Sequence, residues 1–338
     1  MPHSRSPLGR AAWAVTTPLA ALAAARLAGE DRHPMLAVAN AATPFAYLPA
    51  WGAAAVGLRE RRPGLVAVAG AVAAAHAVWT APELARPRPL SPAAAGAPRI
   101  RVVTANVRFP SRNSAPLGEE LAAADADILL LQELSSEHLA MIKSAGAFDG
   151  YPWSYVDPRP GSFGAGIWSK WPLSGGETWE PGGLPMVRAT VDVGGTEVRV
   201  FNVHCKAPMR RRWIPVWKAQ LADLGAAVRS SPSPAIVAGD FNSTAGHAPF
   251  RRLLAEAGLR SAHVEAGRGL ATTWPRGGRV MPPLFRIDHV LVTAGLAVVG
   301  VREGRGPGSD HRPVIADLAL LAAARPGDGG PPPPPSPR

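Results

Sequence analysis

Three long apolar runs open the chain, and short polar or charged turns separate them. They cover residues 11–28, 35–58 and 64–81, and each is close to the roughly 20 residues that an α-helix needs to cross a bilayer. Alanine-rich runs of this kind also form buried helices of soluble proteins. Because three of them follow one another, the pattern favours a membrane segment over residues 1–81 with about three transmembrane helices.

Arginines flank these runs and predict their orientation. Arg5 and Arg10 precede the first run, and Arg59, Arg61 and Arg62 lie between the second and the third. Positive residues collect on the cytoplasmic side, so we expect a multi-pass cell-membrane protein with everything after residue 81 outside the cytoplasm. A cleaved signal peptide is the alternative for the first run, and it leaves the rest of the chain outside as well.

The pattern changes again after the third run and near the end of the chain. Residues 82–98 are rich in proline and alanine, which predicts a semi-rigid linker. Residues 321–338 form a proline-rich tail that cannot build a core, which predicts disorder. Function is therefore expected in residues 99–320.

Within residues 99–320, short apolar runs alternate with turn signals and amphipathic stretches. The predicted strands cover residues 100–107, 126–134, 196–204, 234–240, 286–292 and 313–320. The Gly-Gly pair in "TVDVGGTEVRV" predicts a hairpin, and helices are expected over 117–124, 214–230 and 249–257. Strands this continuously apolar favour sheets that are covered on both faces, hence an α/β domain with layered sheets.

Composition adds limits rather than a function. The 338 residues are 47% hydrophobic, which is enough for a sizeable core. The formal net charge of +11 invites a nucleic-acid interpretation, but nearly all the cations are arginine in an alanine-rich chain, which is typical of a coding bias. The single cysteine, Cys205, excludes an internal disulfide framework and a cysteine-rich zinc site.

Polar side chains stand at or beside the end of each apolar strand. Such residues gather along one edge of a sheet, where a rigid core can hold a site. Singly, each is explained by turn or surface preferences, but six such ends together indicate chemistry. The residues are Asn106, Glu133, His204, Asp240, Asn242, Asp288, Asp310 and His311.

The motifs "TANV", "LLLQEL", "FNVHCKAP", "AGDFN", "RIDHVLV" and "SDHRPVIADL", in this order, resemble those of the endonuclease/exonuclease/phosphatase superfamily. The resemblance covers about residues 99–320, and the segment before it is similar to that of bacterial membrane-anchored members. It implies a four-layered α-β-β-α sandwich like that of deoxyribonuclease I. It also implies metal-dependent hydrolysis of phosphoesters.

The resemblance also implies a role for each polar residue. Glu133 and Asp310 offer carboxylate oxygens and Asn106 an amide oxygen, a set suited to Mg²⁺, with Mn²⁺ and Ca²⁺ as alternatives. Asp240 would orient or deprotonate the attacking water, and Asn242 would bind a phosphate oxygen.

Two histidines complete the expected catalytic set. His311 would contact the phosphate while Asp288 orients it and favours its protonated form. His204 would be a second histidine on the phosphate side, with Asp157 as a positional guess for its carboxylate partner. Cys205 points to the opposite face from His204 and is read as a core residue.

The substrate is the open question. Arg210 and Arg211 stand beside Trp213 and Trp217, an arrangement that would bind nucleic acid or form the solvated face of a helix start. We expect a membrane-anchored phosphoesterase for phosphodiesters or phosphomonoesters, nuclease-like in the first interpretation. A phospholipid or phosphoinositide phosphoesterase and a noncatalytic phosphate-binding module are the alternatives. No obligate protein partner is inferred.

Overall fold

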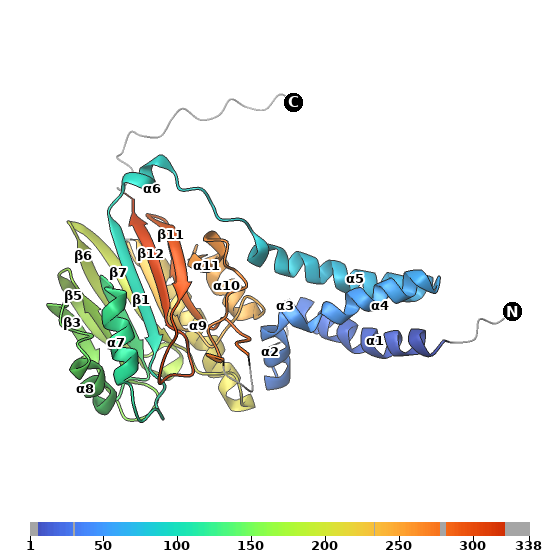
Figure 1. The fold of residues 1–338 in the computed structure, drawn as a ribbon, viewed down its shortest axis with the longest axis horizontal. Coiled ribbons are helices and arrows are strands. Elements are labelled where there is room, and N and C mark those ends of the chain that lie inside the picture. The colour runs from blue at the N-terminus through green and yellow to red at the C-terminus, as the bar shows by residue number, and fades with distance from the viewer. Residues whose placement is uncertain (1–5, 30, 233, 278–281, 322–338) are drawn as a thin grey trace.

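Two six-stranded sheets form the centre of the molecule in the computed structural model, which describes residues 6–29, 31–232, 234–277 and 282–321 (Figure 1). The first sheet has the order β11-β12-β1-β2-β4-β3, with the bounds Leu296–Glu303, Val314–Leu320, Arg99–Asn106, Ile128–Gln132, Ala165–Ser169 and Trp153–Asp157. The second has the order β5-β6-β7-β8-β10-β9, with the bounds Leu173–Trp179, Met186–Val193, Thr196–His204, Ala235–Asp240, Asp288–Val292 and Arg260–Ser261.

Both sheets are mixed at their centres. In the first, β1 pairs in parallel with β2 and antiparallel with β12. In the second, β7 and β8 are parallel while β8 and β10 are antiparallel. Side chains from the facing sides of the two sheets form one continuous buried core, which includes Val102, Leu130, Val200 and Ile236.

Helices cover the outer faces of the two sheets. Helices α7 (Ala115–Ala124) and α8 (Ser136–Ser144) pack on the first sheet. Helices α9 (Ile214–Arg229) and α10 (Ala248–Glu256) pack on the second, and the short α11 (Ala262–Glu265) lies near its β9 edge. The predicted α/β class with layered sheets is confirmed, since one apolar core lies between the two sheets and a further core lies between each sheet and its helices.

The individual elements agree closely with the sequence patterns. The structure contains all six predicted strands, the hairpin of β6 and β7, and the three predicted helices. The ends of these strands and helices lie within two residues of their predicted positions. The sequence patterns did not reveal β3, β4, β5, β11 and the short β9. β3 and β5 are only partly buried, so their sequences lack continuous apolar runs.

The N-terminal region is helical, but its second run is not one helix. The prediction of a single helix over residues 35–58 is wrong: the structure has α2 (Pro34–Ala41), α3 (Thr43–Ala46) and α4 (Leu48–Arg59) instead. Pro44 and Pro49 each stand in the first turn of a new helix, because proline cannot donate a hydrogen bond to the turn before it.

The helices α1 (Pro7–Leu27), α4 and α5 (Pro63–Thr80) contact one another and project from the sandwich (Figure 1). Among the described residues, Pro63–Leu84 is the one helix both long and apolar enough to cross a membrane, with 22 residues and a mean hydropathy of 1.6 over its most apolar 18 residues. Taken alone, one such helix is weak support for a membrane anchor. The predicted three crossings are therefore not confirmed.

The segment expected to be a linker packs against the sandwich. It begins in the 3₁₀-helix Ala81–Leu84 and includes α6 (Pro92–Gly96). Glu83 Oε2 lies 2.6 Å from Arg286 Nη2, and both side chains are buried. Arg286 also donates to the carbonyl oxygen of Gly269. The tail after residue 321 lies outside the described residues.

Replacing Glu83 with alanine should destabilise the protein strongly. It leaves the Arg286 guanidinium buried without its carboxylate, and removing one partner of a buried pair costs about 3–5 kcal/mol. The free energy of unfolding in urea measures this. Arg88→Ala is the control, because the Arg88 side chain is 75% exposed in its pair with Glu265 and should contribute less than about 1 kcal/mol. Equal losses for the two variants would contradict the prediction.

Candidate active site

The central strands of both sheets end at the same place. Asn106 ends β1, while His204 and Asp240 are register partners at the ends of the parallel strands β7 and β8. Asp288 begins β10 opposite Asp240. Asn106 Nδ2 donates to Asp240 Oδ2 at 3.1 Å and so connects the two sheets across the site. The predicted gathering of strand-end residues is thus present for these four.

Asp240 is the most enclosed carboxylate of the group. Its side chain is buried, and its Oδ1 accepts from the backbone N of Asn242 at 2.8 Å. Oδ2 accepts from Asn106 and, at 3.2 Å, from Asn242 Nδ2. Burial raises the pKa of Asp240 to about 6, and the negative charge of Asp288 adds to this while His311 and His204 oppose it. The carboxylate is therefore poised to accept a proton near neutral pH.

The side-chain amide nitrogen of Asn242 points to Asp240. It adopts a left-handed backbone conformation with φ of 47°, a region that asparagine tolerates in tight turns. Its Nδ2 donates to the carbonyl oxygen of Cys205 at 2.8 Å as well as to Asp240. Its amide donors are engaged within the protein, which makes it an orienting residue for Asp240.

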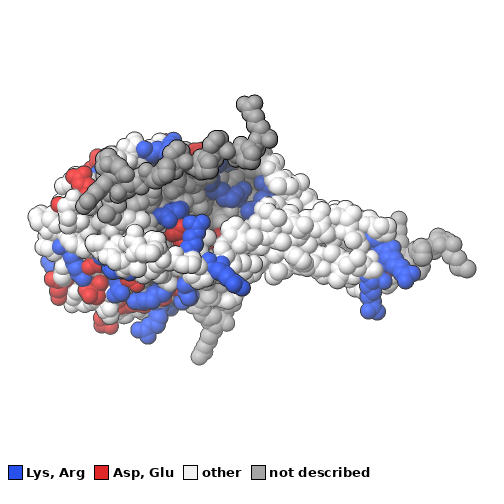
Figure 2. All heavy atoms as spheres, turned by 90° about the horizontal axis from the view of Figure 1, so that it is seen from above, with Lys and Arg blue, Asp and Glu red and all other residues white. Residues whose placement is uncertain are grey.

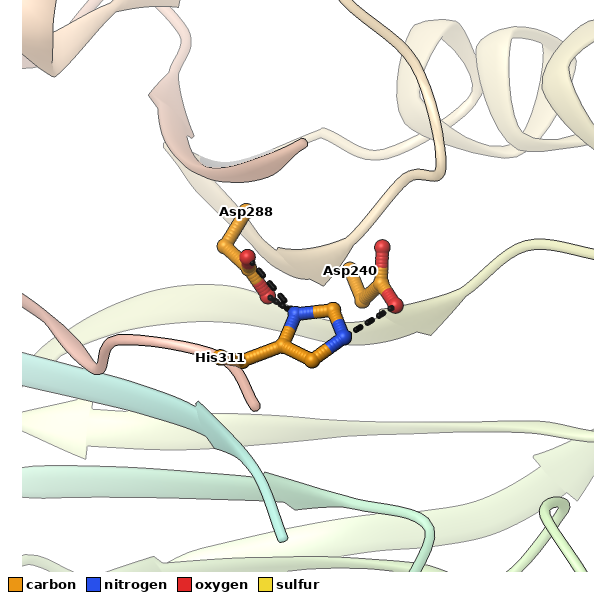
Figure 3. Close-up of side chains that lie close together, drawn as sticks. All are labelled: Asp240, Asp288 and His311. Atoms are coloured by element: carbon orange, nitrogen blue, oxygen red, sulfur yellow. Dashed lines mark hydrogen bonds and ion pairs between the residues drawn. The ribbon is translucent and has the colours of Figure 1, made fainter. Parts of the chain in front are cut away.

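His311 and Asp288 form a buried ion pair beside Asp240 (Figure 3). His311 Nδ1 lies 2.9 Å and 3.1 Å from the two oxygens of Asp288, and its Nε2 lies 3.9 Å from Asp240 Oδ2. Burial lowers the pKa of His311, but the charges of Asp288 and Asp240 outweigh it and raise the pKa to about 10. His311 is therefore an imidazolium at neutral pH.

Glu133 follows β2 in a left-handed conformation with φ of 57°, which turns its carboxylate into the site. Its Oε1 accepts from Asn106 Nδ2 at 3.1 Å and its Oε2 from the backbone N of Phe109 at 2.7 Å. Burial would raise the pKa of Glu133, but the His204 charge and these hydrogen bonds lower it overall. Glu133 is ionised.

Asp310 stands at the outer side of the same cluster. Its side chain is 40% exposed, with Arg108 Nε at 3.7 Å from Oδ1 and Trp274 Nε1 at 3.4 Å from Oδ2. His311 Nε2 lies 4.0 Å from Asp310 Oδ1. Asp310 thus keeps a carboxylate that solvent can reach, beside the enclosed pair.

His204 has carboxylates near it, but they are not the expected one. Its Nε2 lies 3.5 Å from Glu133 Oε1 and 3.8 Å from Asp240 Oδ2. The positional guess of Asp157 is wrong. Asp157 Oδ2 accepts from Arg159 Nε at 2.9 Å and from Thr178 Oγ1 at 2.7 Å, on the outermost strand of the first sheet.

The cluster fits a divalent cation. Four carboxylates, those of Glu133, Asp240, Asp288 and Asp310, meet three described groups that can be positive, His311, Arg108 and the ring of His204 when it is protonated, so negative charge is in excess. Carboxylate oxygens are the donors that Mg²⁺, Mn²⁺ and Ca²⁺ prefer.

Two sets of residues could hold the ion. Ligand atoms of Asp240, Asp288 and His311 lie within 4.8 Å of one another, so distance alone allows an ion there. Both Asp288 oxygens, however, face a ring whose raised pKa keeps both nitrogens protonated. Glu133 and the partly exposed Asp310 are the second candidate set of carboxylate ligands.

A cavity of about 490 Å³ opens onto the cluster. Five of the predicted site residues line it: Glu133, His204, Asp240, Asn242 and His311. Arg210 and Arg211 do not line it. Sequence reasoning missed several lining side chains, among them Lys206 in the "FNVHCKAP" motif, Phe163, and Ala37, Val38 and Ala41 of α2.

Cys205 is a core residue, as predicted. It is fully buried among Phe201, Val203 and Phe241, and burial raises the pKa of its thiol well above the ordinary value. A protonated, enclosed thiol is not a nucleophile. The chemistry of the site therefore rests on the carboxylates and histidines.

Comparison with known proteins agrees with this geometry. The sequence profile of the Endonuclease/Exonuclease/phosphatase family matches residues 103–311. No curated protein sequence matches the chain.

Solved structures share the fold at low sequence identity. An endonuclease/exonuclease/phosphatase from Beutenbergia cavernae is 23% identical, with a TM-score of 0.51 over 67% of this chain and 72% of that one. Truncated TDP2 from Caenorhabditis elegans is 18% identical, with a TM-score of 0.53 over 66% and 98%. A mannosyl-6-phosphatase from Bacteroides thetaiotaomicron is 18% identical, with a TM-score of 0.53 over 65% and 100%.

Proposed function

We propose a function from one premise: this chain belongs to the endonuclease/exonuclease/phosphatase family. Members of that family hydrolyse phosphoesters. We infer that this chain is a membrane-anchored, divalent-metal-dependent phosphoesterase, with residues 99–320 as its catalytic domain. One observation carries the inference: a buried Asp240 is fixed by two asparagines at a cavity wall between His204 and His311.

The proposed chemistry assigns one task to each group. Asp240 accepts the proton of the attacking water, and Asn106 and Asn242 fix its orientation. The His311 imidazolium, held by Asp288, stabilises the negative charge that develops on the phosphate. His204 lies within reach of the same space and is a second contact for a phosphate oxygen.

A divalent cation bound by Glu133, Asp310 and Asn106 would neutralise a phosphate oxygen. In the structure Asn106 presents its amide nitrogen to Glu133 and Asp240, and its oxygen accepts from the backbone N of Arg108 at 2.9 Å. Asn106 would therefore orient the carboxylates of Glu133 and Asp240 around an ion. If its amide group were rotated, its oxygen would be a ligand instead.

The membrane anchor is proposed from the charge distribution of the helical projection. Residues 11–25, 33–58 and 63–82 contain no Asp, Glu, Lys or Arg. Figure 2 shows a largely uncharged surface there, with Lys and Arg at the far end. At about 1.5 Å per residue the 18 residues of α5 span about 27 Å, close to the thickness of a hydrocarbon core. Release of the full chain from membranes at high pH would contradict the anchor.

Chelation of the metal should abolish activity. The full chain, purified in lipid nanodiscs, is expected to release p-nitrophenol from bis(p-nitrophenyl) phosphate with Mg²⁺, and excess chelator should lower the rate by at least about 100-fold. Added Mg²⁺ should restore it. DNA offered in the same assay tests the nuclease-like interpretation. A rate unaffected by the chelator would overturn the metal-dependent mechanism.

The pH profile of kcat should be bell-shaped. Asp240 must be ionised to accept a proton, so activity rises as the pH rises through about 6, or lower where a bound cation favours the carboxylate. His311 must stay protonated, so activity falls as the pH approaches about 10. Initial rates between pH 4 and 11 measure both limbs. A maximum below pH 5 would contradict these roles.

A further inference from the structure

Helix α2 supplies one wall of the active-site cavity, although it belongs to the N-terminal helical region. Ala37, Val38 and Ala41 line the cavity together with the catalytic residues. In Figure 1, α2 lies against the sandwich at the base of the projecting helices. The catalytic sandwich alone therefore does not complete the pocket.

Buried polar contacts fix α2 in this place. His247 Nε2 lies 2.9 Å from the carbonyl oxygen of Ala37, and Thr244 Oγ1 donates to that of Ala41 at 3.3 Å. Asp31, just before the helix, accepts from the backbone N of Ala248 at 2.9 Å. Gly246 lies so close to α2 that a Cβ there would collide with the carbonyl oxygen of Asn40. These contacts make the wall a fixed part of the site.

The wall and the surface opposite it are apolar. Phe163, Met209, Leu284 and Phe285 line the cavity beside Val38. Val38 is 41% exposed and Met209 is 61% exposed, so this surface is accessible to a ligand. A concave apolar surface beside a few polar groups is the usual form of a pocket for a ligand with an apolar part.

Charge argues against a nucleic-acid strand in this pocket. A strand is bound by cations that contact successive phosphates. Among the described lining residues Lys206 is the one Lys or Arg, and its Nζ lies over the rings of Phe163 and Trp213 at 5.0 Å and 4.6 Å. One cation can bind a single phosphate group but not the successive phosphates of a strand.

We propose that the substrate is a lipid phosphoester whose apolar chain lies along α2 while its phosphate reaches Asp240 and His311. The inference rests on the proposed phosphoesterase function and names its substrate class. α2 leads through α3 and α4 into the largely uncharged helical projection, so the cavity lies beside the segment proposed to enter the membrane.

Alkyl phosphates of increasing chain length test this directly. Calorimetry of the full chain in nanodiscs with Mg²⁺ compares ethyl, butyl and hexyl phosphate, with empty nanodiscs correcting for partition into lipid. Each methylene buried against the wall should tighten binding about fourfold, so the four extra methylenes of hexyl phosphate give about 250-fold over ethyl phosphate if all are buried, and at least about 30-fold if two to three are.

Two neutral substitutions locate the effect. Val38→Gln should reduce the hexyl-to-ethyl preference, measured as the ratio of the two affinities, at least about fivefold. Met209→Gln, on the catalytic side of the cavity, should reduce the preference in the same way. It replaces Val38→Gln in the test if that variant does not fold. Met35→Gln is the matched control, because Met35 lies on the same helix, is 75% exposed and does not line the cavity.

The outcomes separate this inference from the proposed function. The lipid assignment is overturned if affinity does not depend on chain length, or if the preference survives both Val38→Gln and Met209→Gln. Either result leaves the proposed phosphoesterase function standing, provided that hydrolysis is chelator-sensitive. Loss of the preference in Met35→Gln would show that α2 acts only through stability, which also overturns it. A chain-length dependence that is present in the wild type and in Met35→Gln but lost in the cavity variants supports the lipid assignment even if bis(p-nitrophenyl) phosphate is not hydrolysed.

Discussion

Asp240→Asn is expected to lower kcat for phosphodiester hydrolysis by about a thousandfold while the protein remains folded. The amide cannot accept the proton of the attacking water, and positioned general bases contribute about 10²- to 10⁴-fold. The substitution is nearly isosteric: the new Oδ1 can still accept from Asn106 Nδ2 and Asn242 Nδ2, while the new Nδ2 faces the backbone N of Asn242 and loses that one hydrogen bond. Steady-state kinetics with bis(p-nitrophenyl) phosphate measure the effect, and KM should change by less than about threefold because the water, not the ester, loses its contact.

Stability should separate this role from a structural one. The Asp240 carboxylate is buried beside Asp288, and its raised pKa shows that its charge is unfavourable there. Asp240→Asn should therefore unfold close to the wild-type temperature, because relief of the unfavourable charge offsets the one hydrogen bond that the amide loses. Asp317→Asn is the control, since Asp317 is 41% exposed in its pair with Arg101 and lies outside the cavity. A loss of kcat that parallels a loss of stability would contradict the assignment of Asp240 as the base.

Asp288→Asn is expected to lower kcat by about 100-fold and to move the alkaline limb of the pH profile to lower pH. The charge of Asp288 is the largest influence that raises the pKa of His311, and the asparagine lacks it. His311 then loses its proton at a lower pH, so activity disappears earlier as the pH rises. The pH dependence of kcat measures the shift.

The direction of that shift distinguishes a positioning residue from a packing residue. A change in packing alone would lower kcat at every pH and leave the limb where it was. His311→Gln provides the matching variant, because it should remove the alkaline limb altogether. An Asp288→Asn profile with an unmoved alkaline limb would contradict the role proposed for this pair.

Much of the fold could be predicted because burial leaves a simple pattern. The strands β1, β2, β8 and β12 are covered on both faces, so they read as continuous apolar runs. The polar residue at each of their ends marks the edge of the core. Asn106, His204, Asp240 and Asp288 could be placed together for this reason.

The remainder depends on contacts between distant segments. The carboxylates beside His204 are Glu133 and Asp240, which only the meeting of the two sheets brings near it. Asn242 has an amide suited to a phosphate, yet its backbone turn directs that amide to Cys205 and Asp240. The wall formed by Val38 had no signal in the sequence, because an apolar helix that lines a cavity has the composition of one that crosses a membrane.

The Mg²⁺ concentration that gives half the maximal rate of bis(p-nitrophenyl) phosphate hydrolysis tests the central claim most directly. It should be compared in the wild type, Glu133→Gln and Asp240→Asn. We predict that Glu133→Gln raises this concentration at least about tenfold, because a carboxylate ligand is lost, while Asp240→Asn lowers the maximal rate and changes the concentration by less than about threefold. A wild-type rate that does not depend on Mg²⁺, or a Glu133→Gln variant with the same requirement, would contradict a metal-dependent phosphoesterase in which Asp240 activates the water.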